Sequence, residues 1–131
     1  MNTKLIVLAA TVLGLAAQDP FRRITADVPF AFEANGVKLA AGTYMVKAPG
    51  SLGVVTVVEM ATGRSIMLRA GGAERNPGRT NSLEFKRYGD AYFLSAVKVA
   101  VSGERVGLAQ SRRQMELAIG IRPETILALA K

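Results

Sequence analysis

The sequence predicts a mainly β protein, a single antiparallel β-barrel or β-sandwich of about seven to eight strands with one short helix in the C-terminal region. Three observations predict this fold. Apolar residues alternate with period two along most of the chain, glycine-bearing turns separate the alternating runs, and only one late segment has helical spacing. The 131 residues suffice for one ordinary domain and are too few for two.

Residues 1–17 have the features of an export signal. Lys4 supplies a small positive region, Leu5–Leu15 supply an apolar run, and small residues continue to Ala17. The run is shorter than the ~20 residues that a membrane-spanning helix needs, which favours a signal peptide over a retained helix or anchor. We expect export to the periplasm or the extracellular space, with no membrane span after signal removal. The expected division is signal peptide 1–17, lead-in segment 18–27 and single β domain 28–131.

The first expected strand covers residues 28–34 (VPFAFEA), where large apolar residues alternate with small or charged ones. Pro29 lacks an N–H and indicates that this strand starts at a sheet edge. Asn35 and Gly36 follow, and both tolerate the positive φ of a two-residue hairpin turn. The implied register pairs apolar with apolar and acid with base, namely Phe32 with Leu39 and Glu33 with Lys38.

Three further strands are expected at residues 43–48, 54–60 and 64–70. The middle one, VVTVVEM, is β-branched and apolar on both faces, which indicates a central strand covered on each side. The polar, glycine-bearing residues 71–80 are predicted to form a loop.

Residues 82–97 (SLEFKRYGDAYFLSAV) predict a hairpin around Gly89 and Asp90. Gly89 is expected at the first central position of the turn, with positive φ. Phe93 falls among polar neighbours on the second face, so either the helix covers it or its ring is a contact surface. The residues expected to share the apolar face are Leu83, Phe85, Leu94 and Ala96.

The helix is predicted to begin after Ser111, because Ser111 and Gln114 have the spacing of a capping box. Met115, Ala118 and Ile119 follow at helical spacing, and Gly120 can end the helix. A short strand is expected before it, near residues 105–109. The last segment, residues 123–131, could be a strand or a helical turn, and we favour a strand because it would cover a sheet edge.

Three runs of this chain, VPFAFEANGVKLAAGTY, LEFKRYGDAYFLSAV and SRRQMELA, resemble a group of small exported proteins of unknown function found mainly in Acidobacteria. Their pattern is a V-P-F-x-F strand, an A-G-x-Y turn, an R-Y-G-x-x-Y-F-L hairpin and a Ser-Arg helix. The resemblance implies a fold and export, and no activity. Two positions depart from it: Ala40 stands where proline is usual, and Lys86 where histidine is common.

The composition argues against an enzyme. The chain has no histidine and no cysteine, which removes the common metal ligands and every Ser-His or Cys-His pair. A Ser-Lys dyad or a carboxylate pair remains formally open, but the glutamates are spread over separate strands and turns. We therefore expect no catalytic residues, no metal and no cofactor.

The net charge of +7 suits attraction to an anionic polymer. The basic residues are scattered, which is unlike a specific nucleic-acid-binding segment. Arg75 and Arg79 could bind an anion, although their segment lacks the spacing, the lysine and the following helix of a nucleotide-binding loop. The candidate contact surface is therefore Phe93, Lys86, Arg75 and Arg79.

The function expected from the sequence is a non-catalytic binding or structural module of the cell envelope, with an envelope component or an anionic polymer as its partner. One alternative is a carrier of a small apolar ligand, which requires an empty β-barrel interior. Another is an anion- or polysaccharide-binding protein that uses its basic surface. The carrier cavity would be lined by Phe30, Phe32, Val57 and Leu94.

Overall fold

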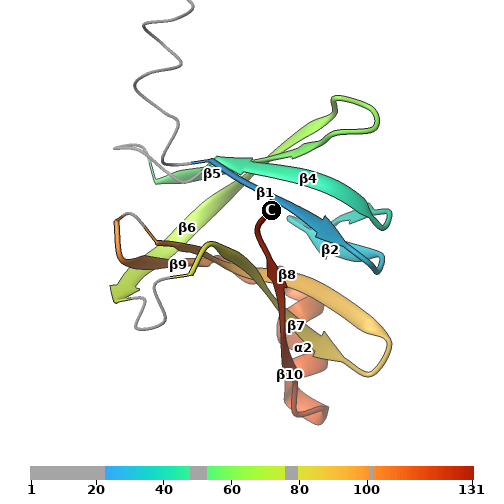
Figure 1. The fold of residues 1–131 in the computed structure, drawn as a ribbon. Helices are drawn as coiled ribbons and strands as arrows, with labels where there is room; N and C mark the ends of the chain where they lie inside the picture. The colour runs from blue at the N-terminus through green and yellow to red at the C-terminus, as the bar shows by residue number, and fades with distance from the viewer. Residues whose placement is uncertain (1–22, 48–52, 76–79, 101) are drawn as a thin grey trace, which may run out of the picture.

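The computed structural model describes residues 23–47, 53–75, 80–100 and 102–131, which form one strongly bent β-sheet with a helix on its outside (Figure 1). The described part of the chain is mainly β, as predicted, but the sheet has ten strands instead of seven or eight. Its one helix is α2 (Arg112–Gly120), close to the C-terminus as predicted. The strands are β1 (Arg23–Val28), β2 (Phe32–Ala34), β3 (Val37–Leu39), β4 (Gly42–Lys47), β5 (Val54–Glu59), β6 (Ser65–Arg75), β7 (Ser82–Tyr88), β8 (Ala91–Val99), β9 (Glu104–Leu108) and β10 (Glu124–Leu129).

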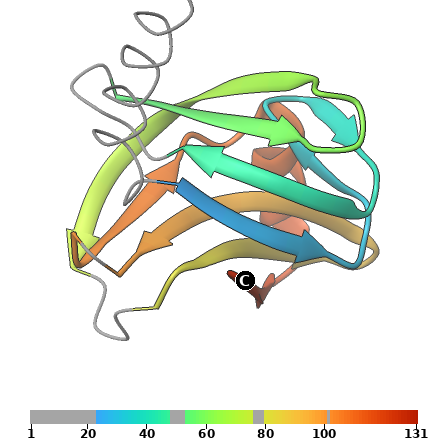
Figure 2. The ribbon, with the colours of Figure 1, turned by 45° about the horizontal axis from the view of Figure 1, so that its top comes forward.

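The strand order is β1-β4-β5-β6-β9-β8-β2-β3, and β7 pairs with both β8 and β10. The sheet is mixed, because β2 runs parallel to β8 whereas the other described pairs are antiparallel. Figure 2 shows the sheet curling so that β1 comes round towards β7. Ala26 and Ala130 form an isolated bridge there, and no ladder joins β1 to β10. The barrel is therefore not closed.

The core fills the concave side of the bent sheet. Tyr44 and Phe85 are its largest fully buried side chains, and Phe30 packs edge-on against Phe85 with the ring centroids 5.0 Å apart. Rings and β-branched side chains from nearly every strand meet in one cluster, which is the packing that a half-buried sheet needs. Its buried members are Ile24, Ala26, Val28, Phe32, Ala34, Leu39, Tyr44, Val46, Val55, Val57, Leu68, Leu83, Phe85, Leu94, Val97, Val99, Val106, Leu108 and Ala128.

The turn between β2 and β3 has the predicted geometry. Asn35 has φ +50° and Gly36 φ +74°, and the register of Phe32 with Leu39 and of Glu33 with Lys38 is confirmed. The strand expected at residues 28–34 is wrong in one respect. β1 ends at Val28, and β2 begins only after the bend that contains Pro29, which cannot donate to a ladder. β1 itself begins at Arg23, inside the segment expected to be a lead-in.

Strands β5 and β6 differ from expectation, β5 in how many of its faces are covered and β6 in its length. β5 lies between β4 and β6 as predicted, but only Val55 and Val57 are buried, so one face is covered and the other is half-exposed. The loop predicted at residues 71–80 is wrong at its start, because β6 continues to Arg75 and pairs with β9 through a bulge at Gly71. A glycine there lets the backbone kink without steric cost.

The β7–β8 hairpin has Gly89 at the first turn position with φ +63°, as predicted. The expected register holds from the turn back to Phe85 with Leu94, and then shifts because Ser95 is an extra residue in β8. Beyond this bulge Leu83 faces Val97 instead of Ala96. A one-residue shift sends every later side chain to the other face, so Val97 joins the core cluster, whereas Ala96, although fully buried, is not part of it.

Helix α2 begins with the predicted cap, because the Ser111 hydroxyl accepts a hydrogen bond from the Gln114 N–H at 3.2 Å. Met115 and Ile119, whose spacing helped to predict the helix, are exposed, and Gln114 is buried. The final segment is a strand, β10, as we favoured. No helix in the described residues is long and apolar enough to cross a membrane.

Candidate functional site

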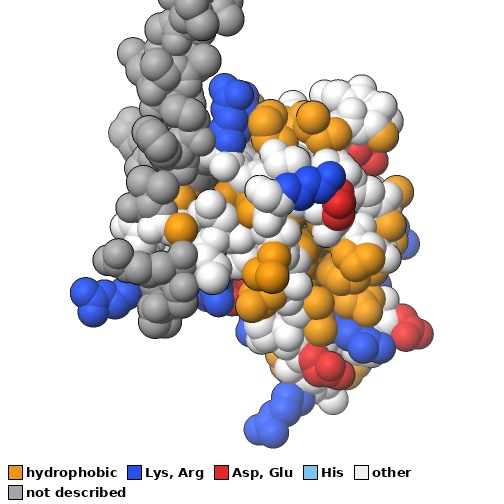
Figure 3. All heavy atoms as spheres, in the orientation of Figure 1, with side chains coloured by type: hydrophobic (Ala, Val, Ile, Leu, Met, Phe, Trp, Pro, Cys, Tyr) orange, Lys and Arg blue, Asp and Glu red, His pale blue; other side chains and the backbone are white. Residues whose placement is uncertain are grey.

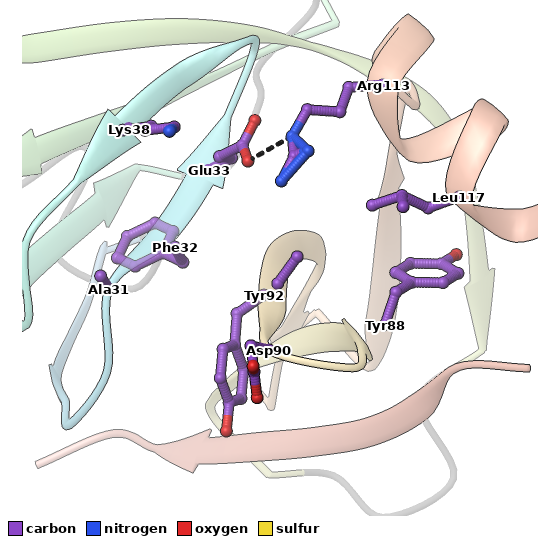
Figure 4. Close-up of a pocket in the computed structure, with 10 residues that line it drawn as sticks. Ala31, Phe32, Glu33, Lys38, Tyr88, Asp90, Tyr92, Arg113 and Leu117 are labelled. Atoms are coloured by element: carbon purple, nitrogen blue, oxygen red, sulfur yellow. Dashed lines mark hydrogen bonds and ion pairs between the residues drawn. The ribbon is translucent and has the colours of Figure 1, made fainter. Parts of the chain in front are cut away.

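A pocket of about 420 Å³ opens between α2, β2 and the tip of the β7–β8 hairpin (Figure 4). It opens beside α2, and Phe32 of the core forms part of its wall. In Figure 4 its walls are Phe32 and Ala31 on one side, Leu117 and Tyr88 on the other, with a linked Glu33 and Arg113 between them. The lining residues are Ala31, Phe32, Glu33, Lys38, Tyr88, Asp90, Ala91, Tyr92, Arg113 and Leu117.

Arg113 is held in the wall by two contacts. Its Nε donates to Glu33 Oε2 at 2.9 Å, and its guanidinium lies 5.7 Å from the centre of the Phe93 ring. The parallel pairing of β2 with β8 sets Glu33 directly beside Phe93, so one arginine can reach both. The Glu33 side chain is 10% exposed and that of Arg113 is 49% exposed. The guanidinium is thus fixed in orientation while its outer edge meets solvent, which suits it to recognise a carboxylate or phosphate.

The tyrosines of the pocket are also fixed by neighbouring rings. Tyr88 meets Phe93 edge-on at 5.8 Å, and Tyr92 stacks on Phe30 at 3.9 Å. The Arg87 guanidinium lies 5.5 Å from the centre of the Tyr92 ring. Rings held in this way lose little conformational freedom when a ligand binds, so the pocket is largely pre-formed.

The charges of the pocket are two cations and two anions. Glu33 is engaged by Arg113, and Lys38 lies opposite Glu33 in the β2–β3 hairpin. Asp90 is exposed at the hairpin tip. Because Glu33 is already paired, the donors that remain for a ligand are the outer nitrogens of Arg113 and the ammonium of Lys38. The site therefore offers positive donors beside aromatic and apolar walls.

The residues predicted as a contact surface are not brought together as one surface. Phe93 is only 2% exposed, so the expectation of an accessible ring is wrong; α2 covers it, which was the other possibility. Lys86 is its cross-strand neighbour, and the Lys86 Nζ donates to Thr125 Oγ1 of β10 at 2.7 Å. Arg75 is exposed at the end of β6, opposite Glu104 of β9. Arg79 lies outside the described residues.

A second group of charges lies on the convex face of β7, β8 and β9. Glu84 is 4% exposed and receives two hydrogen bonds from Arg105, with Lys98 Nζ 3.8 Å away. The hydrogen bonds from Arg105 hold the pKa of the Glu84 carboxyl below its ordinary value, although burial opposes this. These groups satisfy one another, so the cluster is structural. Figure 3 shows the basic side chains otherwise scattered over the visible face, as the sequence suggested.

Within the described residues there is no group of three or more acidic, histidine or cysteine side chains that could hold a metal ion. Comparisons with protein families, with characterised proteins and with solved structures found no match. The resemblance to the small exported proteins of Acidobacteria therefore stays an expectation from the sequence.

The sequence did not reveal Arg113 as a site residue. Arg113 and Glu33 are separated by 80 positions, and each has an ordinary local role, one in the first turn of a helix and the other in a hairpin. Only the packing of α2 against β8 brings them together. The one available signal was Phe93, an aromatic residue on an otherwise polar strand face, which indicated either that the helix covers it or that its ring is a contact surface.

Proposed function

We propose that this protein is a non-catalytic, exported binding module of the cell envelope, which takes a carboxylate-bearing sugar unit of an anionic polymer into the Arg113 pocket. The observation that carries the proposal is an arginine fixed by Glu33 and Phe93 in the wall of a pocket lined by two tyrosines. A planar guanidinium can bind a carboxylate through two parallel hydrogen bonds. Aromatic walls suit the apolar face of a sugar ring.

The non-catalytic part of the proposal rests on the chemistry of the side chains. The chain has no histidine or cysteine, and the one buried carboxylate of the pocket, Glu33, is neutralised by Arg113. A general base needs a free, suitably perturbed group within reach of a substrate proton. Export is supported by the leader-like composition of residues 1–17, and N-terminal sequencing of protein recovered outside the cytoplasm is its test.

The carrier alternative finds no support in the packing. Phe32, Val57 and Leu94 belong to one continuous buried cluster, and Phe30 packs against it. A carrier would need these side chains to line an empty interior. Of these four residues, Phe32 alone also lines the described pocket, which opens at the surface beside α2.

The test is calorimetric titration of the protein with oligouronates and with neutral oligosaccharides of the same length. Arg113→Gln should weaken oligouronate binding by about 10- to 100-fold, which is the worth of a charge-assisted hydrogen bond. Arg112→Gln is the matched control, since it removes the same charge from the next, exposed residue and should change affinity by less than about threefold. Ala31→Trp, at an exposed position of the rim, should block the pocket without disturbing the core.

Three outcomes would contradict the proposal. Equal binding of oligouronates and neutral sugars would remove the role of charge, and equal effects of Arg112→Gln and Arg113→Gln would remove the role of the pocket. Shortening of the oligouronate during the titration would show catalysis. Circular dichroism and urea unfolding of each variant establish that it is folded before its affinity is compared.

A further inference from the structure

Helix α2 exposes two large apolar side chains. Met115 is 51% exposed and Ile119 is 88% exposed, the largest exposure among the big apolar side chains of the described residues. With 3.6 residues per turn, Arg112, Met115 and Ile119 lie within about 60° of one another around the helix axis. They form one stripe, which we call the outer stripe of α2. An amphipathic helix on a protein surface ordinarily points such residues at the core.

The opposite side of the helix is fixed and cannot exchange places with the outer stripe. Gln114 is buried and only 3% exposed, Arg113 is paired with Glu33, and Leu117 lines the pocket. Rotating the helix to bury Met115 and Ile119 would break the ion pair and uncover Phe93. The exposure of the stripe is therefore a property of the folded protein.

Positive charge flanks the stripe at both ends. Arg112 is exposed at the start of α2, and Arg122 is exposed two residues after its end, next to Ile121, which is 40% exposed. Glu116 is exposed at the edge of the stripe, about 60° from Ile119 and about 100° from Met115 around the helix axis. Apolar side chains between arginines are complementary to a surface that is apolar inside and anionic at its rim, which describes the headgroup region of an anionic bilayer.

We propose that the outer stripe of α2 docks on an anionic lipid bilayer, with Met115 and Ile119 among the headgroups and acyl chains and with Arg112 and Arg122 on lipid phosphates. A second copy of the chain fits less well. A stable protein interface buries about 800 Å² on each partner, whereas the stripe comprises one side of a nine-residue helix. This inference is independent of the ligand of the pocket, although docking would bring Arg113, on the adjoining side of α2, close to the membrane surface.

The test is sedimentation of the protein with phosphatidylcholine vesicles that contain or lack phosphatidylglycerol. We expect binding to the anionic vesicles that falls with added salt, and little binding to phosphatidylcholine alone. Ile119→Ser and Met115→Ser should each weaken binding severalfold, and Arg112→Gln about fivefold, which corresponds to about 1 kcal/mol for one arginine at the surface. Met67→Ser is the matched control: Met67 is 66% exposed on β6, outside α2, and its replacement should have no effect.

Binding that is equal for the two vesicle types, or that Met67→Ser weakens as much as Met115→Ser, would overturn the proposal. Light scattering of the free protein supplies a second criterion. A dimer that Ile119→Ser dissociates would assign the stripe to a second copy and not to lipid. Ala31→Trp, which blocks the pocket and leaves the charges of α2 unchanged, should keep vesicle binding within about threefold of wild type, so the two proposals can fail separately.

Discussion

Arg105 donates two hydrogen bonds to Glu84, from Nε to Oε1 at 3.2 Å and from Nη2 to Oε2 at 2.5 Å. β8 lies between the strands that carry them, so this pair links β7 to β9 across an intervening strand. Lys98 of β8 lies 3.8 Å from the same carboxylate. The outside of the sheet is thus held by ionic contacts where the inside is held by apolar packing.

Arg105→Ala should lower the free energy of unfolding by roughly 3 kcal/mol, because it leaves the buried Glu84 carboxylate with only the more distant Lys98. Glu74→Ala is the control. Glu74 also contacts Arg105, at 3.5 Å, but its side chain is 72% exposed, so its loss should cost less than about 0.5 kcal/mol. Urea unfolding measures both, and equal losses would show that Glu84 does not depend on Arg105.

Acid should weaken the protein partly through Glu84. Its pKa in the folded state is lowered below the ordinary 4.5 by the hydrogen bonds from Arg105, so the carboxylate stabilises the fold above pH 4.5. That contribution is lost as the pH falls from 4.5 through the folded pKa. The free energy of unfolding of wild type should therefore drop more steeply below pH 4.5 than that of Glu84→Gln. Parallel curves for the two proteins would assign the acid sensitivity to other groups.

Gly89→Val should destabilise the fold by roughly 1–3 kcal/mol through backbone strain. Gly89 has φ +63°, and an added Cβ would meet nothing within 4 Å, so crowding contributes nothing. Gly72→Val is matched to it, because a Cβ there is equally free while φ is not in the left-handed region. Thermal unfolding should show a lower Tm for the first variant and an unchanged or higher Tm for the second.

Phe93→Ala should be as damaging as Phe85→Ala, each costing about 3–5 kcal/mol. Phe85 is fully buried in the core, and Phe93 is buried between the sheet and α2, where it contacts Tyr88 and Arg113. The two differ in consequence, because only Phe93→Ala removes the ring beneath Arg113 and should also weaken ligand binding. If Phe93→Ala unfolds at the same urea concentration as wild type, the placement of α2 is wrong.

Tyr44 should ionise only well above the ordinary tyrosine pKa of 10. Burial, and then the nearby Glu59 carboxylate, raise the pKa of its hydroxyl to about 12, and the hydroxyl donates to the Ala40 carbonyl at 2.5 Å. Since the folded pKa lies above the unfolded value of 10, this group stabilises the fold below pH 10 and ceases to do so as the pH rises through about 12. In an ultraviolet titration, Tyr44→Phe should remove the step near pH 12.

The parts of the fold that the sequence predicted are those decided by neighbouring residues. Asn35 and Gly36 need positive φ in one hairpin turn and Gly89 needs it in another, and the Ser111 cap is a contact within one helical turn. These features depend on contacts and backbone sterics among neighbouring residues, so a short stretch of sequence is enough to predict them.

The parts that the sequence did not predict are decided by distant residues. The bulge at Ser95 lies in β8, which pairs with both β7 and β9, and the run FLSAV contains no residue that predicts it. The pocket needs Glu33 beside Phe93 and Arg113 above them, which only the parallel contact of β2 with β8 provides. Met115 and Ile119 have helical spacing, but spacing alone does not tell which side of a helix the sheet will cover.

The bridge between Ala26 and Ala130 has a kinetic consequence. It joins the first described strand to the segment after the last one, and the Lys131 N–H adds a bond to the Thr25 carbonyl at 2.8 Å. No local structure can bring these residues together, so they meet only after the intervening hairpins have formed. Sheets completed by such distant pairings reach the native state in about milliseconds to seconds, far more slowly than helical bundles. During that interval the edges of β1 and β10 stay open, and association with another chain competes with closure.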